Sequence, residues 1–268
     1  MIIDKLNSLK TEYFRFGSGS RPLVILPGIG LQRVSLSAAA VKNTYKDFCD
    51  DFTVFVIDRR EELPERCGIE LFADDVAAAM DALGIGSADI FGASMGGMIA
   101  QLIALRHPEK VDSLILGSTL ARPNPTSEKT IGEWIRLAEE KDLDRLAQNM
   151  LPKLYTPRLA DQLLLAVDLL FLNVTEKDFE RFTTQARAIE GFDILDRLGD
   201  IRCPALVLGV EGDKVVTAEA SREIAARMNA ELYIYDSSHA HCVFDEDRDF
   251  QKRMLDFLLK RANTKSNR

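Results

Sequence analysis

A serine between two glycines is the first feature of the chain that could do chemistry. Ser94 is the central residue of GASMG, residues 92–96, which fits the pattern G-x-S-x-G. The short segment 89–91 (DIF) precedes it and a nearly continuous apolar stretch, 95–106, follows it, so the sequence predicts a strand, a sharp turn and a helix. Such a turn presents the serine oxygen at a helix start, where negative charge is stabilised. We interpret Ser94 as a nucleophile; the alternative is a plain glycine-rich turn.

A serine nucleophile needs a base that takes its proton, and the chain has three histidines. His107 lies at the far end of the helix that follows Ser94, about 20 Å away at 1.5 Å per residue, and is too distant. His239 and His241 both follow the last predicted strand. Because they are two residues apart, strand alternation does not separate them, and either could be the base.

The acid that orients the histidine is expected after the preceding predicted strand, 205–208. Two carboxylates lie there, Glu211 and Asp213, in the sequence GVEGD. We prefer Asp213, which follows Gly212 in a turn, and keep Glu211 as the alternative. The acid would fix the imidazole tautomer and stabilise the imidazolium ion.

Acyl transfer also needs backbone N–H groups that stabilise an oxyanion. One is expected from Met95, directly after the nucleophile. The second is expected from Ile29, because residues 26–30, LPGIG, follow the first predicted strand and Gly28 permits an unusual turn. The sequence contains neither G-x-G-x-x-G nor G-K-[ST], so these glycines do not indicate a phosphate-binding loop. No metal and no organic cofactor is expected.

The elements that must position these residues alternate along the chain. Continuous apolar strands between helices are typical of the α/β class, with a mostly parallel sheet covered by helices on both faces. We expect the polar residues 261–268 to be frayed. The predicted strands are 23–26, 53–57, 89–91, 113–116, 205–208 and 232–235, and the predicted helices are 71–83, 95–106, 217–228 and 247–260.

The alternation is interrupted once, between residues 122 and 198, where no convincing strand occurs. Ile131, Trp134 and Ile135 share one helix face, and residues 163–172, LLLAVDLLFL, form the most apolar stretch of the chain. We interpret 122–198 as a helical cap inserted into a core domain of 1–121 and 199–268. The alternative is a few ordinary covering helices.

Composition excludes several other classes of protein. The 268 residues are 46% hydrophobic and 28% charged, and 34 Lys and Arg against 42 Asp and Glu give a net charge of −8, which argues against a nucleic-acid partner. We find no apolar stretch of about 18 residues that would span a membrane. Residues 1–10 lack a signal peptide's apolar segment, and the four cysteines form no CxxC pair. We expect a cytoplasmic protein with reduced thiols and a small-molecule substrate. The sequence leaves open whether the protein forms a homo-oligomer.

Five segments of the chain resemble the α/β-hydrolase superfamily, in the group of small esterases, enol-lactonases and cofactor-free haloperoxidase-like proteins. The segments are LVILPGIG (23–30), TVFVIDRR (53–60), DIFGASMGGMIAQLIALRHPEKV (89–111), ALVLGVEGDKVV (205–216) and HAHCVFDEDRDF (239–250). The resemblance implies an α/β-hydrolase fold and a triad in the chain order Ser94, Asp213, His241. The family's block before the final helix begins with the catalytic histidine, which favours His241 over His239.

Two departures from the family pattern concern the same site. The family often has His-Gly where this chain has Pro27-Gly28, which keeps the oxyanion backbone and removes a side-chain support. It often has Gly-His before the last helix, where this chain has Ala240-His241.

The expected function is hydrolysis of a small carboxylic ester, lactone or thioester through an acyl-enzyme on Ser94. The alternatives are C–C hydrolysis or perhydrolysis by the same triad, and a non-catalytic binding module on the same fold. Arg33 and Arg122 are expected near the pocket mouth and could hold a substrate carboxylate, although a solvated arginine is the plainer interpretation. Trp134 could line the pocket or belong to the core.

Overall fold

The computed structural model describes residues 1–6 and 9–266 and forms one eight-stranded sheet. The strand order is β1-β2-β4-β3-β5-β6-β7-β8. β1 pairs with β2 and β2 with β4 in antiparallel fashion, whereas the neighbours from β4 to β8 are parallel. The strands are β1 (Ile2–Leu6), β2 (Thr11–Phe16), β3 (Arg21–Leu26), β4 (Phe52–Ile57), β5 (Ala88–Ala93), β6 (Val111–Gly117), β7 (Ala205–Val210) and β8 (Glu231–Tyr235).

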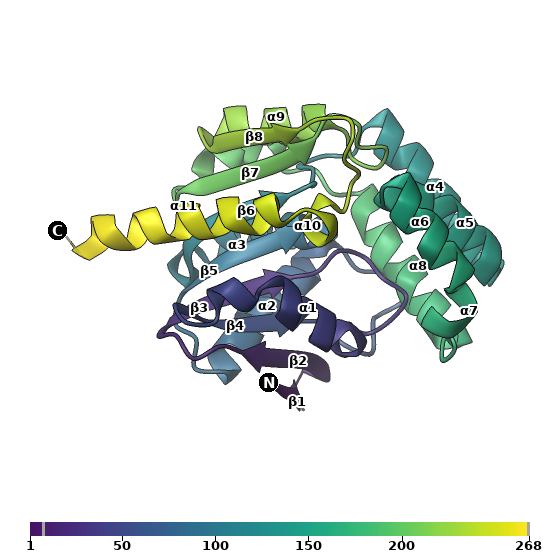
Figure 1. Cartoon of the computed structure of the whole chain (residues 1–268), viewed down its shortest axis with the longest axis horizontal. Helices are drawn as coiled ribbons and strands as arrows, with labels where there is room; N and C mark the ends of the chain where they lie inside the picture. Colours follow the sequence, from purple (N-terminus) through teal and green to yellow (C-terminus); the bar gives the residue numbers. More distant parts are fainter. Residues whose placement is uncertain (7–8, 267–268) are drawn as a thin grey trace.

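Two hydrophobic clusters cover the two faces of the sheet. Alternate residues of one strand enter different clusters: Ile90 packs in one and Phe91 in the other. Helices α2 (Ile69–Ala82), α3 (Met95–Arg106) and α9 (Ala218–Met228) contribute to the first cluster. Helices α1 (Ala38–Thr44) and α11 (Arg248–Ser266) cover the opposite face, with α11 crossing in front of the sheet in Figure 1. The predicted α/β architecture is confirmed.

The six predicted strands and four predicted helices are present, but several elements of the structure are not predicted from the sequence. Among these are β1 and β2, which extend the sheet at its antiparallel edge. β1 is mostly exposed and lacks the continuous apolar run that marks the buried strands. The last helix continues to Ser266, and the expected fraying of residues 261–268 stays a prediction; residues 267–268 lie outside the described residues. The short elements not predicted are α1, α10 (Val243–Glu246) and the 3₁₀ turns Val34–Ser37, Lys46–Phe48, Pro108–Lys110 and Leu195–Asp200.

Five helices lie between β6 and β7, and Figure 1 shows them gathered at one end of the sheet. Asn124 begins the first of them, because its side chain accepts hydrogen bonds from the backbone of Thr126 and Ser127 in a capping box. Leu165, Leu169 and Leu172 are exposed by 92%, 76% and 74%, so the most apolar stretch of the sequence lies largely on the surface. The helices are α4 (Pro125–Glu139), α5 (Leu143–Leu154), α6 (Pro157–Leu165), α7 (Val167–Leu170) and α8 (Glu176–Glu190).

Candidate active site

Ser94 lies between the end of β5 and the start of α3, in a backbone conformation that non-glycine residues rarely adopt. Its φ is 53° and its ψ is −120°. A side chain at Gly92 would collide with the Gly96 carbonyl, and one at Gly96 would collide with the Leu26 carbonyl. The two glycines therefore allow β5, α3 and the end of β3 to meet closely at this turn.

Neighbouring groups hold the Ser94 turn in place. The Ser94 N–H donates to the carbonyl of Gly117 at 2.9 Å, and the Thr119 hydroxyl donates to the Ser94 carbonyl at 2.7 Å. The N–H of Gly97 donates to the same carbonyl at 2.9 Å, as expected at a helix start. The turn is thus tied to the end of β6 and to the first turn of α3.

His241 and Asp213 form a buried pair beyond the ends of β8 and β7. Nδ1 of His241 lies 2.8 Å from Oδ2 of Asp213, and each side chain is 1% exposed. The other carboxylate oxygen accepts from the backbone N–H groups of Val215 at 2.7 Å and Val216 at 3.0 Å. Burial acts to raise the pKa of Asp213, but His241 and these two N–H groups outweigh it and hold that pKa below its usual value.

Two hydrogen bonds hold the loop that carries His241. The N–H of Cys242 donates to the carbonyl of Leu154, the last residue of α5, at 2.8 Å. The N–H of Thr156 donates to the Glu246 carboxylate at 3.0 Å. The loop that carries His241 is therefore attached to the junction between α5 and α6.

His239 has a different set of partners. Its Nε2 lies 3.0 Å from Asp247 and its Nδ1 lies 3.2 Å from Asp236, near the surface. Burial acts to lower the pKa of His239, but the two carboxylates outweigh it and raise that pKa. Glu211 likewise pairs with Arg222 at the surface.

The loop after β3 lies against the Ser94 turn. A Cβ atom built on Gly28 would stand 3.3 Å from the Ser94 Cβ and 3.6 Å from the Ala93 carbonyl oxygen. Ile29, the predicted oxyanion donor, follows in this loop and is partly buried. Met95, the other predicted donor, is the first residue of α3 and is fully buried.

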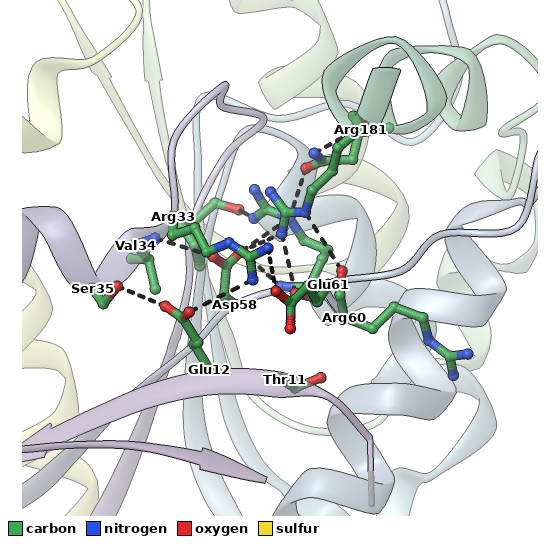
Figure 2. A network of polar contacts seen from close by, with 12 residues as sticks. Thr11, Glu12, Arg33, Val34, Ser35, Asp58, Arg60, Glu61 and Arg181 are labelled. Carbon is green, nitrogen blue, oxygen red and sulfur yellow. Dashed lines mark hydrogen bonds and ion pairs between the residues drawn. The ribbon is translucent and has the colours of Figure 1, made fainter. Parts of the chain in front are cut away.

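The residues predicted to bind substrate have partners within the chain. Arg33 lies 3.6 Å from Glu12 and 3.0 Å from Glu61 (Figure 2). Arg122 pairs with Glu223 at 2.8 Å. Trp134 is 1% exposed, packs in the main core cluster, and donates from Nε1 to Asn149 at 3.1 Å.

The sequence analysis does not single out a buried charged cluster beside the loop after β3. Asp58, Arg59 and Arg181 have side chains that are at most 5% exposed, and Figure 2 shows Asp58 and Arg181 pointing toward one another. Burial lowers the pKa of Arg59 to about 10, although Asp58 opposes that shift. The available signal is the charged sequence DRR directly after a continuous apolar strand.

Within residues 1–6 and 9–266, no group of three or more His, Cys, Asp or Glu side chains could hold a metal ion. None of the helices in that part of the chain is both long and apolar enough to cross a membrane.

Comparisons with known proteins agree on the fold. Residues 21–248 match the family model described as the alpha/beta hydrolase fold. The chain is 25% identical to 3-oxoadipate enol-lactonase 2 of Acinetobacter baylyi over 262 residues, which is 94% of each chain. It is 27% identical over 226 residues to a protein named as a candidate carbamate hydrolase, RutD, of Rhizobium rhizogenes, covering 80% of this chain and 86% of the relative.

A solved structure has the same architecture. The crystal structure of the enol-lactonase from Burkholderia xenovorans LB400 superposes with a TM-score of 0.81 at 25% identity, covering 96% of this chain and all of that one. The chain therefore belongs to the α/β-hydrolase family, and it is a hydrolase of that family.

Proposed function

We propose that this hydrolase cleaves a small carboxylic ester, lactone or thioester through an acyl-enzyme on Ser94. The observation that carries the proposal is the 2.8 Å contact between buried Asp213 and His241. A carboxylate that accepts from Nδ1 leaves the other ring nitrogen, Nε2, free to take a proton from a serine. Ser94 occupies the strained turn that characterises serine nucleophiles in this fold.

In the proposed reaction, Ser94 Oγ attacks the substrate carbonyl carbon while its proton passes to Nε2 of His241. Asp213 stabilises the resulting imidazolium ion, and the N–H groups of Ile29 and Met95 donate to the oxyanion. The intermediate collapses, and the leaving oxygen or sulfur takes the proton from His241. Water then attacks the acyl-enzyme with His241 as base, releasing the carboxylic acid and free Ser94.

Helices α4 to α8 are proposed as the cap over this site. The carboxyl ends of strands in open α/β sheets are where ligands bind. Contacts of these helices with the loops after β7 and β8 support the role: Thr130 donates to the carbonyl of Lys214 at 3.2 Å, and Cys242 donates to Leu154 at 2.8 Å. Substrate choice is then expected to depend on the cap, and the chemical step on the core.

The activities for which two relatives are named guide the choice of substrates. Enol-lactonases act on cyclic esters, and a carbamate hydrolase acts on a carbonyl that bears nitrogen. Both substrates present a carbonyl carbon to a nucleophile, as esters and thioesters do. We therefore favour a carbonyl substrate of small size, with lactones and short esters as the first compounds to test.

The test is a panel of esters, lactones and thioesters, run on the wild type and on Ser94→Ala, together with labelling by a fluorophosphonate. Removing a serine nucleophile is expected to lower turnover by about 10³-fold or more, because triad members act as a unit. Mass spectrometry should find the label on the peptide that contains Ser94. Full turnover of Ser94→Ala would refute the acyl-enzyme. A protein that binds the panel compounds but neither labels nor turns them over would be a binding module.

A further inference from the structure

The side chain of Arg59 bridges two parts of the proposed site that are far apart in the sequence. Its Nη1 donates to the carbonyl of Pro27 at 2.9 Å, and its Nε donates to Oε1 of Gln185 at 2.8 Å. Pro27 belongs to the loop after β3, and Gln185 belongs to helix α8 of the proposed cap. One planar guanidinium therefore contacts both the core and the cap.

The carbonyl that Arg59 holds belongs to the loop that would bind the oxyanion. The Pro27 carbonyl and the Gly28 N–H share one planar peptide group, so fixing the carbonyl also fixes the plane that precedes Gly28. Gly28 has no Cβ and its backbone can adopt many conformations. Its close approach to Ser94 allows little error in the position of the loop. The loop thus needs an external contact, and Arg59 provides one.

A buried carboxylate holds Arg59 and the cap helix together. Asp58 accepts from the Arg59 N–H at 2.7 Å and from Nη2 of Arg181 on α8 at 3.1 Å. Burial acts to raise the pKa of Asp58, but Arg59 and Arg181 outweigh it and lower that pKa, so the carboxylate stays charged. Nη2 of Arg181 also donates to the Arg59 carbonyl at 3.1 Å. Figure 2 shows Asp58 and Arg181 beside the pair formed by Arg33 and Glu61.

The cap side of the bridge is equally constrained. Gln185 is 0% exposed, and its Nε2 donates to the carbonyl of Arg181 at 3.1 Å, which leaves Oε1 facing Arg59. A displacement of α8 would therefore be transmitted through Gln185 to Arg59 and on to Pro27. Buried hydrogen bonds of this kind are costly to leave unmade, so the connected groups are expected to move together.

We infer that Arg59 is a positioning residue that holds the oxyanion loop in place and couples it to the cap through Gln185. This inference rests on the proposed function, because it assigns a role to the loop of Gly28 and Ile29. In this role Arg59 acts through the loop and not through a contact with the substrate. It orients the backbone that donates to the oxyanion, so its loss should weaken binding of the tetrahedral state more than binding of the substrate.

The experiment compares Arg59→Met, Arg59→Lys and the wild type, with a trifluoromethyl ketone analogue of the best ester as the probe. Ser94 Oγ adds to the ketone carbon and its proton passes to His241, which gives a reversible tetrahedral adduct with an oxyanion. Loss of one oxyanion donor costs about 10²–10³-fold in other enzymes. We expect Arg59→Met to weaken binding of the analogue by about tenfold or more, while the KM for the ester changes by less than about threefold. Arg59→Lys should be intermediate, because a single ammonium does not reproduce the two-sided guanidinium contact.

Arg60→Met is the matched control. Arg60 is the neighbouring arginine, and it pairs with the buried carboxylate of Asp75 on α2, not with the loop after β3. Its replacement also leaves a buried charge without a partner, so it reports the effect of lost stability alone. Analogue affinity close to that of the wild type is expected in this variant; an equal loss in Arg60→Met and Arg59→Met would overturn the inference.

Gln185→Leu and Gln185→Glu test the cap side without changing the loop. Glutamate keeps an oxygen that can accept from Arg59, whereas leucine does not. We expect Gln185→Leu to bind the analogue more weakly than Gln185→Glu. Equal affinities of these two variants for the analogue would overturn the coupling. The same comparison decides the inference if Arg59→Met does not fold. Absence of a label on Ser94 in the wild type would refute the proposed function itself. A label on Ser94 together with unchanged analogue affinity in folded Arg59→Met would refute only the positioning role.

Discussion

His239 and His241 are two residues apart, yet their rings have different surroundings. The pair of His241 with Asp213 is buried at 1% exposure of each side chain, whereas His239 is 24% exposed between Asp236 and Asp247. We expect His241→Ala to lose about 10³-fold or more in kcat/KM, because the proposed base is removed. His239→Ala is expected to keep activity within about tenfold of the wild type. Steady-state kinetics on the best ester measure both, and the reverse ranking would make His239 the base.

The loss of stability in the His239→Ala variant should depend on pH. The pKa of His239 is raised in the folded chain, so its charged form contributes stability at low pH, and that contribution is lost as pH rises through the folded pKa. His239→Ala should therefore lose more stability near pH 5 than near pH 9 in urea unfolding. An equal loss at both pH values would mean that the carboxylates of Asp236 and Asp247 do not stabilise the charged ring.

Local patterns predict some residues of the site and leave others open. Ser94 and its glycines can be recognised from sequence because the turn is made by neighbours in the chain. The spacing of His239 and His241 from Ser94 does not separate them, since the difference arises from the conformation of the loop 236–247 and from its contacts with Leu154 and Thr156. Arg59 is missed because its role depends on Pro27 and Gln185, which lie far away in the sequence.

At the scale of elements, strands that are buried on both faces can be recognised from the sequence. β5 and β7 are buried at every position, and their apolar runs are visible without any tertiary information. β1 is held by pairing with β2 rather than by a buried side-chain pattern, so its sequence carries little signal. The helices between β6 and β7 can be recognised as helical, but which side chains they bury depends on the core they pack against: Trp134 is buried there and Leu165 is exposed.

The junction between α5 and α6 should affect catalysis through the histidine loop. Both the N–H and the hydroxyl of Thr156 donate to Glu246, in the short helix that follows His241. Glu246→Ala leaves a partly buried N–H without its acceptor, which is expected to cost about 1–3 kcal/mol of stability. We also expect kcat/KM to fall, because the loop that carries His241 loses one of its attachments.

Glu246→Gln is the control for this junction, because its side-chain oxygen can still accept from the Thr156 N–H. Thermal unfolding and kcat/KM should place Glu246→Gln between the wild type and Glu246→Ala. If Glu246→Ala lost stability with no change in kcat/KM, the junction would support the fold without affecting the position of His241.

At the scale of the whole molecule, the stability of the folded protein in acid should depend strongly on Asp58. This carboxylate is 1% exposed between Arg59 and Arg181, and it links the end of β4 to the loop of Val34 and to α8. Its pKa is lowered in the folded chain, so its stabilising effect is fully present above the unfolded value of about 3.9 and is lost as pH falls through the lower folded value. Acid should therefore loosen the proposed cap and the core together.

Asp58→Asn tests this link between charge and stability. At pH 7 the change leaves two buried arginines without their anion, which is expected to cost about 3–5 kcal/mol. Urea unfolding at pH 7, 5, 4 and 3 should show the difference from the wild type narrowing below about pH 4, because the unfolded wild type then takes up a proton at Asp58 that the folded wild type does not yet bind. Asp74→Asn is the matched control, because Asp74 also has a lowered pKa but pairs with Arg106 and His107 at the surface, where such pairs contribute about 0–1 kcal/mol. A difference between Asp58→Asn and the wild type that stayed constant from pH 7 to 3 would show that the pKa of Asp58 is the same in the folded and the unfolded protein, and would contradict the lowered pKa.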